Sequence, residues 1–167
     1  MNRVLYTILC RFSFVLVFGS AAGALAQTAP AKWSPQVWLN AGTYSYHFDR
    51  NKDLREDNIG FGAEVWLSDD HALMGGTFIN STRMRSHYGA YQWRPLHWQL
   101  AGVKVGAGIT LGALEGYPRY RDGGWFLAAL PAISVEYERV GVNLFVVPTI
   151  SNRIDGALSV QFKLRVW

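Results

Sequence analysis

The sequence has almost no cysteine. Cys10 is the only one among 167 residues, and it lies in an N-terminal stretch that we expect to be removed. Without it the chain has no disulfide, no thiol nucleophile and no thiolate ligand for a metal. The excess of positive over negative charge is also small: the formal net charge is +4, and loss of Arg3 and Arg11 would leave about +2. This excess is too small to indicate a nucleic-acid partner.

Long apolar runs are missing as well. No run reaches the roughly 20 residues that a transmembrane helix needs. The longest begins at Phe12 and leads to Ala24-Leu25-Ala26, the small-x-small pattern that signal peptidase reads. We therefore expect residues 1–26 to be a signal peptide cleaved after Ala26, and the protein to reach the cell outer membrane of a Gram-negative bacterium. A short segment, 27–35, would precede one folded domain.

Alternation of apolar and polar residues fills the remaining chain. Segments of about ten residues alternate in this way between turn-rich clusters, which is typical of outer-membrane barrels. The predicted strands are 36–49, 58–68, 71–81, 86–95, 98–112, 124–138, 139–149 and 155–167. A turn at 95–97 would join the fourth and fifth strands. The sequence thus predicts an all-β, eight-stranded antiparallel transmembrane β-barrel over 36–167, with the chain ends and short turns in the periplasm.

The alternation also assigns side chains to the two faces of the barrel. Phe162 and Leu164 should meet lipid, whereas Gln161 and Lys163 should face the lumen. Trp167 does not follow this alternation, and a bulge at the strand end is the one explanation available. Several lumen-facing charges share the periplasmic half of the barrel, namely Glu64, Arg94, Lys104, Glu136, Lys163 and Arg165. Because an unpaired buried charge costs several kcal/mol, we expect them to pair as a structural plug.

The half of the lumen away from the periplasm should be lined by small and apolar side chains. The residues expected there are Gly60, Gly62, Gly106, Gly108, Phe126, Leu130 and Phe145. Glycines opposite apolar side chains suggest room for a slim apolar ligand such as an acyl chain. Alternatively, the glycines only relieve crowding in a twisted barrel. Aromatic belts at the membrane surfaces are expected from residues that include Trp66, Trp93 and Trp98.

Candidate chemistry lies at the outer rim. His47 shares lumen parity with Thr43 and Ser45, and Ser81 is expected to point inward from the third strand. A base and a hydroxyl in this place would suit acyl transfer, although an inward histidine is also a common polar cap. Asn80 falls on the other face but could turn in and donate a hydrogen bond.

Arginines in the outer loops form a predicted rim for lipid A phosphate, since guanidinium groups bind phosphate bidentately. They are Arg83, Arg85, Arg119 and Arg121. Solvated loops beside an anionic membrane are the alternative. His71 and His97 are expected in short turns far from the other histidines, so neither a metal site nor a cofactor is predicted.

A series of short motifs resembles a known family. In order they are Phe48-Asp49, Gly60-Phe61-Gly62, Phe78-Ile79-Asn80-Ser81, Tyr88-Gly89, Trp93-Arg94-Pro95, Leu130-Pro131 with Ser134-Val135, and Val147-Pro148. Their order and strand placement are similar to the lipid A palmitoyltransferase (PagP) family, small outer-membrane barrels that move a palmitoyl chain from a phospholipid to lipid A. The resemblance implies a membrane-embedded barrel with phospholipid and lipid A as partners.

The chain departs from that family at three places. The segment 27–35 is too short for the family's amphipathic helix, and Asn80-Ser81 stands where the family has Asp-Ser. The family's histidine would fall near Thr43, whereas the nearest histidine here is His47. These departures favour a PagP-like relative that binds an acyl chain or lipid without catalysis.

Two alternatives stay open. One is a lipid A acyltransferase that uses His47 and Ser81, and the other is a soluble periplasmic calyx resembling a lipocalin. The calyx would leave an apolar band exposed to water. We expect a monomer.

Overall fold

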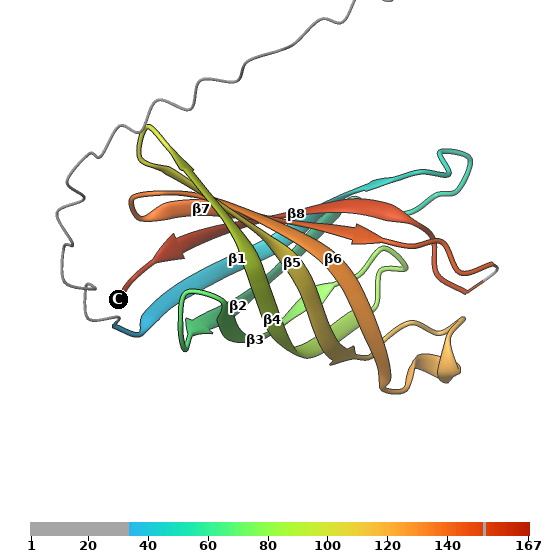
Figure 1. The fold of residues 1–167 in the computed structure, drawn as a ribbon. Coiled ribbons are helices and arrows are strands. Elements are labelled where there is room, and N and C mark those ends of the chain that lie inside the picture. Colours follow the sequence, from blue (N-terminus) through green and yellow to red (C-terminus); the bar gives the residue numbers. More distant parts are fainter. Residues whose placement is uncertain (1–33, 152) are drawn as a thin grey trace, which may run out of the picture. The chain divides into compact units, whose positions relative to one another are not determined.

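The computed structural model describes residues 34–151 and 153–167, which form one closed antiparallel barrel of eight strands (Figure 1). The strands are β1 (Gln36–His47), β2 (Asp57–Trp66), β3 (His71–Ile79), β4 (Arg85–Leu100), β5 (Val103–Leu114), β6 (Phe126–Tyr137), β7 (Val140–Val147) and β8 (Ala157–Arg165). Each strand pairs with its neighbours in sequence, and β1 pairs with β8 to close the barrel. The predicted eight-stranded antiparallel barrel is therefore confirmed. The predicted signal peptide lies outside the described residues.

The connections differ in length at the two ends of the barrel. The turns at 67–70, 101–102 and 138–139 are short, and β1 begins and β8 ends beside them. We call this the turn end. The connections 48–56, 80–84, 115–125 and 148–156 are longer, and we call their side the loop end. The third of these loops contains a single 3₁₀ turn, η1 (Arg121–Gly123).

The turn between β4 and β5 is not at 95–97, as predicted, but at Ala101-Gly102. Both residues have positive φ, 49° and 83°, which is the backbone form of a two-residue hairpin turn. Pro95 stays within β4 because the pairing with β5 is irregular between Trp93 and Leu96, and a bulge tolerates a residue that cannot donate. As a result His97 belongs to a strand and not to a turn.

A bulge in β1 changes which side chains face the lumen. The register of β1 shifts between Ala41 and Thr43 against β2. Trp38 is buried before the shift, whereas Ser45 and His47 are buried after it. The predicted inward direction of His47 is therefore confirmed, but the same alternation does not extend to the start of the strand.

A second irregularity explains Trp167. The amides of Val166 and Trp167 both donate to the Val37 carbonyl, over 2.9 and 3.2 Å. Two residues thus oppose one, which resets the alternation at the end of the strand. Trp167 is exposed on the outside.

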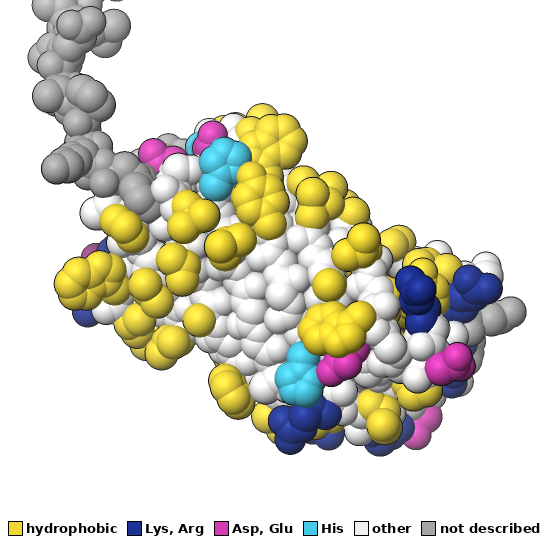
Figure 2. Space-filling model, turned by 90° about the horizontal axis from the view of Figure 1, so that it is seen from below, with side chains coloured by type: hydrophobic (Ala, Val, Ile, Leu, Met, Phe, Trp, Pro, Cys, Tyr) yellow, Lys and Arg dark blue, Asp and Glu magenta, His cyan; other side chains and the backbone are white. Residues whose placement is uncertain are grey.

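The outside of the barrel is largely apolar. Phe61 and Leu127 are 71% and 84% exposed, and Figure 2 shows hydrophobic side chains spread over one face, with charged side chains toward its ends. Trp93 and Trp98 are exposed as expected, but Trp66 is buried inside the barrel and belongs to no aromatic belt. None of the helices in the described chain is long and apolar enough to cross a membrane.

The turn-end half of the lumen is filled by a charged plug. Lys163 Nζ donates to Glu64 over 2.8 Å and to Glu136 over 2.7 Å, and Arg94 donates to Glu136 over 3.2 Å. The Arg94 guanidinium lies 3.6 Å from the ring centre of Trp66. These four charges are the predicted plug. Lys104 and Arg165 were expected in it as well, but Lys104 is exposed and Arg165 is partly exposed near the turn end.

Candidate functional site

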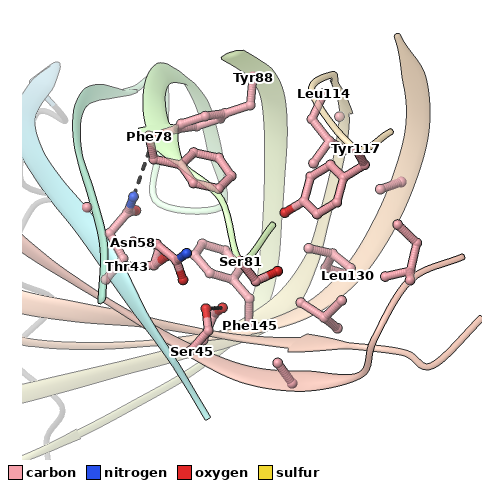
Figure 3. A pocket seen from close by; sticks show the side chains of 18 of the residues that line it. Thr43, Ser45, Asn58, Phe78, Ser81, Tyr88, Leu114, Tyr117, Leu130 and Phe145 are labelled. Carbon is pink, nitrogen blue, oxygen red and sulfur yellow. Dashed lines mark hydrogen bonds between the residues drawn. The ribbon is translucent and has the colours of Figure 1, made fainter. Parts of the chain in front are cut away.

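Above the plug the loop-end half of the lumen holds a cavity of about 160 Å³ (Figure 3). Its wall is mainly aromatic and aliphatic. The large apolar side chains that line it include Met74, Phe78, Tyr88, Leu114, Tyr117, Leu130 and Phe145. The cavity is closed below by packed side chains around Met74 and Phe145, which are both buried. A ligand must therefore enter from the loop end or through the wall.

The predicted lipid-binding residues divide into three groups. Leu130 and Phe145 line the cavity (Figure 3). Phe126 is buried instead in a cluster with Tyr117 and Tyr120, with ring centres 5.8 and 4.6 Å away. The four glycines lie outside the cavity wall.

Crowding, not ligand space, accounts for three of these glycines. A Cβ at Gly62 would lie 2.5 Å from the Tyr88 hydroxyl. At Gly106 a Cβ would make only ordinary contact with the Arg94 side chain, at 3.4 Å from Cδ. At Gly60 and Gly108 a Cβ would meet the backbone of the neighbouring strand. The alternative explanation, that they relieve close contacts, thus fits Gly60, Gly62 and Gly108 but not Gly106.

Two tyrosines of the cavity were not predicted. Tyr88 faces the lumen from β4, where it packs against Phe78 with ring centres 6.0 Å apart. Tyr117 reaches the cavity from loop 115–125 (Figure 3), and burial raises its pKa to about 12. Alternation along β4 could have identified Tyr88, but a loop carries no such periodicity and Tyr117 could not be found in this way.

His47 and polar neighbours form one side of the cavity. His47 is 3% exposed, and its Nδ1 has no hydrogen-bond partner within the described chain. Beside it, the hydroxyls of Ser45 on β1 and Ser159 on β8 are 2.7 Å apart. A ligand at this side would meet hydroxyl and imidazole groups directly below the loops.

Ser81 also lines the cavity, but it does so from the turn after β3 and not from the strand itself, as was predicted. On β3 the buried residues are Ala72 and Met74, so strand parity points Asn80 inward and not Ser81. Ser81 stands in the turn after the strand and faces the cavity from there (Figure 3). The structure thus brings His47 and Ser81 to one cavity.

Asn80 holds loops together and is not positioned for chemistry. Its Nδ2 donates to Ser86 Oγ over 2.9 Å and to the Gly116 carbonyl over 2.6 Å. Its Oδ1 accepts from the Thr82 and Met84 amides over 2.9 and 3.1 Å. With both ends of its amide engaged and no exposed surface, it has no group left for a substrate. The predicted catalytic role of Asn80 is therefore not supported by its geometry.

The four arginines of the predicted rim have different surroundings. Arg83 forms an ion pair with Asp53 at 3.0 Å, whereas Arg119 lies 3.7 Å from Asp155. Lys52 also pairs with Asp155. Arg119 and Asp155 line the cavity mouth, and Arg85 and Arg121 are exposed away from it. Ion pairs thus join the loops 48–56, 115–125 and 148–156 above the cavity.

The pairing between β6 and β7 does not extend along the whole length of β6. The two strands pair from Ala132 to Tyr137, although β6 begins at Phe126. Pro131, which cannot donate, marks the point where pairing ends. Above it Leu130 faces the cavity, while Leu127 is exposed on the outside.

The described residues contain no group of three or more histidine, cysteine or acidic side chains that could hold a metal. No family model matches the sequence, and no curated protein matches it either. The site must therefore be interpreted from its own geometry: an apolar cavity with a histidine and a serine at its upper side, beneath loops tied by ion pairs.

Proposed function

We propose that this protein is an outer-membrane barrel that binds an acyl chain or lipid, in the manner of a PagP-like relative. The observation that carries the proposal is the apolar cavity between Phe78, Leu130 and Phe145 (Figure 3). It lies on the loop-end side of the charged plug. The plug blocks the lumen, so the cavity is a blind pocket and not a channel. A slim hydrocarbon chain is the ligand class that such a wall favours.

The outer surface supports a membrane location for this pocket. Large apolar side chains such as Phe61 and Leu127 face outward with no protein to cover them. In water this band would be an exposed apolar surface of the kind that soluble monomers rarely carry. The soluble calyx is disfavoured for this reason, and phospholipid and lipid A become the partners within reach.

Acyl transfer is the second candidate function, and one observation favours it. His47 and Ser81 both line the acyl cavity. His47 could accept a proton from a lipid hydroxyl through its unpaired Nδ1, while a serine hydroxyl could donate to the developing oxyanion. The proton removed from the attacking hydroxyl would return to the leaving alcohol of the phospholipid.

The test uses the full chain produced in a Gram-negative host. Outer membranes are isolated, the protein is purified in detergent, and lipids bound to it are identified by native mass spectrometry. Lipid-binding function predicts a co-purified or exchangeable acyl lipid. Recovery of the folded protein without detergent, or of a detergent-solubilised barrel that takes up no lipid, would refute it.

The same preparation separates the two candidates. It is supplied with a mixed-chain phospholipid and lipid A, and mass spectrometry follows acylated product. Product that is lost in both His47→Ala and Ser81→Ala would establish acyl transfer. A folded barrel that binds lipid but forms no product would leave the binding function alone.

A further inference from the structure

Two arginines and one carboxylate line the mouth of the cavity. They are Arg119 of loop 115–125, and Arg153 and Asp155 of loop 148–156. Asp155 lies 3.7 Å from Arg119 and is in closer contact with Lys52, which is outside the cavity wall. Arg153 has no ion pair within residues 34–151 and 153–167. Because two cations share the one carboxylate and a third is unpaired, positive charge is in excess at the mouth.

Arg153 lies beside the aromatic residues of loop 115–125. Its guanidinium carbon is 6.0 Å from the ring centre of Tyr120. The Tyr120 ring packs against Phe126, which also packs against Tyr117, with ring centres 4.6 and 5.8 Å apart. In addition, the Tyr120 amide donates to the Tyr117 carbonyl over 2.8 Å. These contacts place Arg153 and Tyr117 at the same side of the cavity.

Tyr117 adds an uncharged donor to this side. Figure 3 shows its hydroxyl directed into the cavity. In the described chain no hydrogen-bond partner offsets the burial of this hydroxyl, although buried polar groups are normally paired. A phenol hydroxyl and guanidinium groups can all donate to an oxyanion. The mouth therefore favours a ligand with a negatively charged oxygen group at the outer end of its hydrocarbon chain.

We infer that this ligand is a free fatty acid, whose carboxylate meets Arg119, Arg153 and Tyr117 and whose chain points toward the floor. The inference rests on the proposed acyl-binding function and specifies its ligand. Met74 and Phe145 at the floor suit a methyl end. In a phospholipid the glycerol backbone separates the phosphate from the acyl chain, so an acyl chain in the cavity would present only an uncharged ester to these donors.

The experiment compares three probes that share one dodecanoyl chain and differ in the head. Dodecanoic acid carries a carboxylate, monododecanoylglycerol carries no charge, and dodecanoyl lysophosphatidylcholine carries a phosphate beyond the glycerol. The full-chain protein is kept in a neutral sterol-based detergent, which has no alkyl chain to compete for the cavity. Isothermal titration calorimetry in alkaline buffer, where the acid is ionised, gives the Kd of each probe. The probes also enter micelles, so the quantity compared is the ratio of Kd between variant and parent protein.

We expect Arg153→Gln to weaken binding of dodecanoic acid about tenfold, equivalent to about 1.4 kcal/mol, because it removes a charge-assisted hydrogen bond. The other two probes should bind as they do to the parent protein. Arg153→Lys keeps the charge and should retain the preference for the acid, which shows that a loss in Arg153→Gln is not a folding defect. The matched control is Arg139→Gln, which removes an exposed arginine at the turn end and should change no Kd.

Tyr117→Phe tests the uncharged donor separately. It keeps the ring and removes the hydroxyl, and it should weaken binding of dodecanoic acid about fivefold without affecting the neutral glycerol ester. Tyr120→Phe makes the same change in the same loop, but Tyr120 is outside the cavity wall. It should leave the affinity for all three probes unchanged.

The outcomes separate this inference from the function on which it rests. If Arg153→Gln and Tyr117→Phe leave dodecanoic acid binding unchanged, or weaken all three probes alike, the inference fails while acyl binding stands. If only the lysophospholipid loses affinity, the arginines bind phosphate and the fatty acid is again excluded. If the folded parent protein binds none of the probes, acyl binding is overturned together with the inference.

Discussion

Lys163 is the residue on which the lower half of the barrel depends most. Its side chain is fully buried and contacts two carboxylates, those of Glu64 and Glu136. Its ammonium also lies 4.6 Å from the ring centre of Trp38. Asn143 donates a further hydrogen bond to Glu64 over 2.8 Å. Removing this one cation would leave Glu64 without a charged partner in the described structure, since Arg94 pairs with Glu136.

We predict that Lys163→Met lowers the free energy of unfolding by about 3–5 kcal/mol, because it leaves buried carboxylate charge uncompensated. The measurement is urea unfolding in detergent micelles, followed by tryptophan fluorescence. Lys104→Met is the matched control: Lys104 is exposed, and its replacement should change stability by less than about 0.5 kcal/mol. Equal effects of the two substitutions would show that the plug does not stabilise the barrel.

His47 shows how a residue can be predicted while its surroundings are not. Alternation placed it inside the barrel, and there it lies. The bulge between Ala41 and Thr43 decides at which point along β1 that alternation begins. Because a bulge depends on pairing with both neighbouring strands, no pattern within β1 itself could reveal it.

At the scale of elements, the loops form a connected cover over the cavity. Asn80 is central to it, since its amide joins the turn 80–84 to Gly116 of loop 115–125. Asp155 links Lys52 and Arg119 in the same way. The upper wall is therefore shaped by side-chain contacts between loops and not by the strand ladder alone.

Asn80→Asp tests this role directly. Aspartate keeps the acceptor for Thr82 but cannot donate to the Gly116 carbonyl, and it places negative charge against that oxygen. We predict faster limited proteolysis within 80–84 and 115–125 and a loss of about 1–3 kcal/mol of stability, as expected for a buried group without its partner. No gain of acyltransfer activity should follow, although the substitution restores the Asp-Ser pair of the resembling family.

A suitable control is Ser81→Ala, which changes the neighbouring side chain without removing any hydrogen bond of the Asn80 amide. It should leave the protease pattern unchanged. Faster transfer to lipid A by Asn80→Asp, with intact loops, would contradict the structural role and reinstate this position as part of the chemistry.

The inner and outer surfaces of the barrel differ in polarity. The lumen carries paired charges and the blind cavity, whereas the outside carries side chains such as Phe61 and Leu127 that have no partner within the barrel. Short turns at one end and longer loops at the other complete this asymmetry (Figure 1). This arrangement is typical of an outer-membrane barrel.

If that placement holds, an outward charge should be costly in the middle of a strand. We predict that Phe61→Lys lowers stability in phospholipid vesicles by about 2–4 kcal/mol, whereas Phe48→Lys at the loop end costs about 0–1 kcal/mol. Folding yield and urea unfolding in vesicles provide the measurement. Similar small costs at both positions would indicate that Phe61 does not contact lipid.

The sequence alone determined the number of strands, their antiparallel order and the outward and inward faces of most of them, because a period of two persists wherever the outer face is apolar and the inner face lines the lumen. It also identified the plug charges, Leu130 and Phe145. The break in alternation at Trp167 indicated the bulge that the structure shows there. Only the tertiary structure decided the turn at Ala101-Gly102, the bulge in β1, the use of the glycines and Asn80, and the entry of Tyr117 into the cavity. These features depend on contacts between strands and loops distant in the chain, which leave no periodic trace in the sequence.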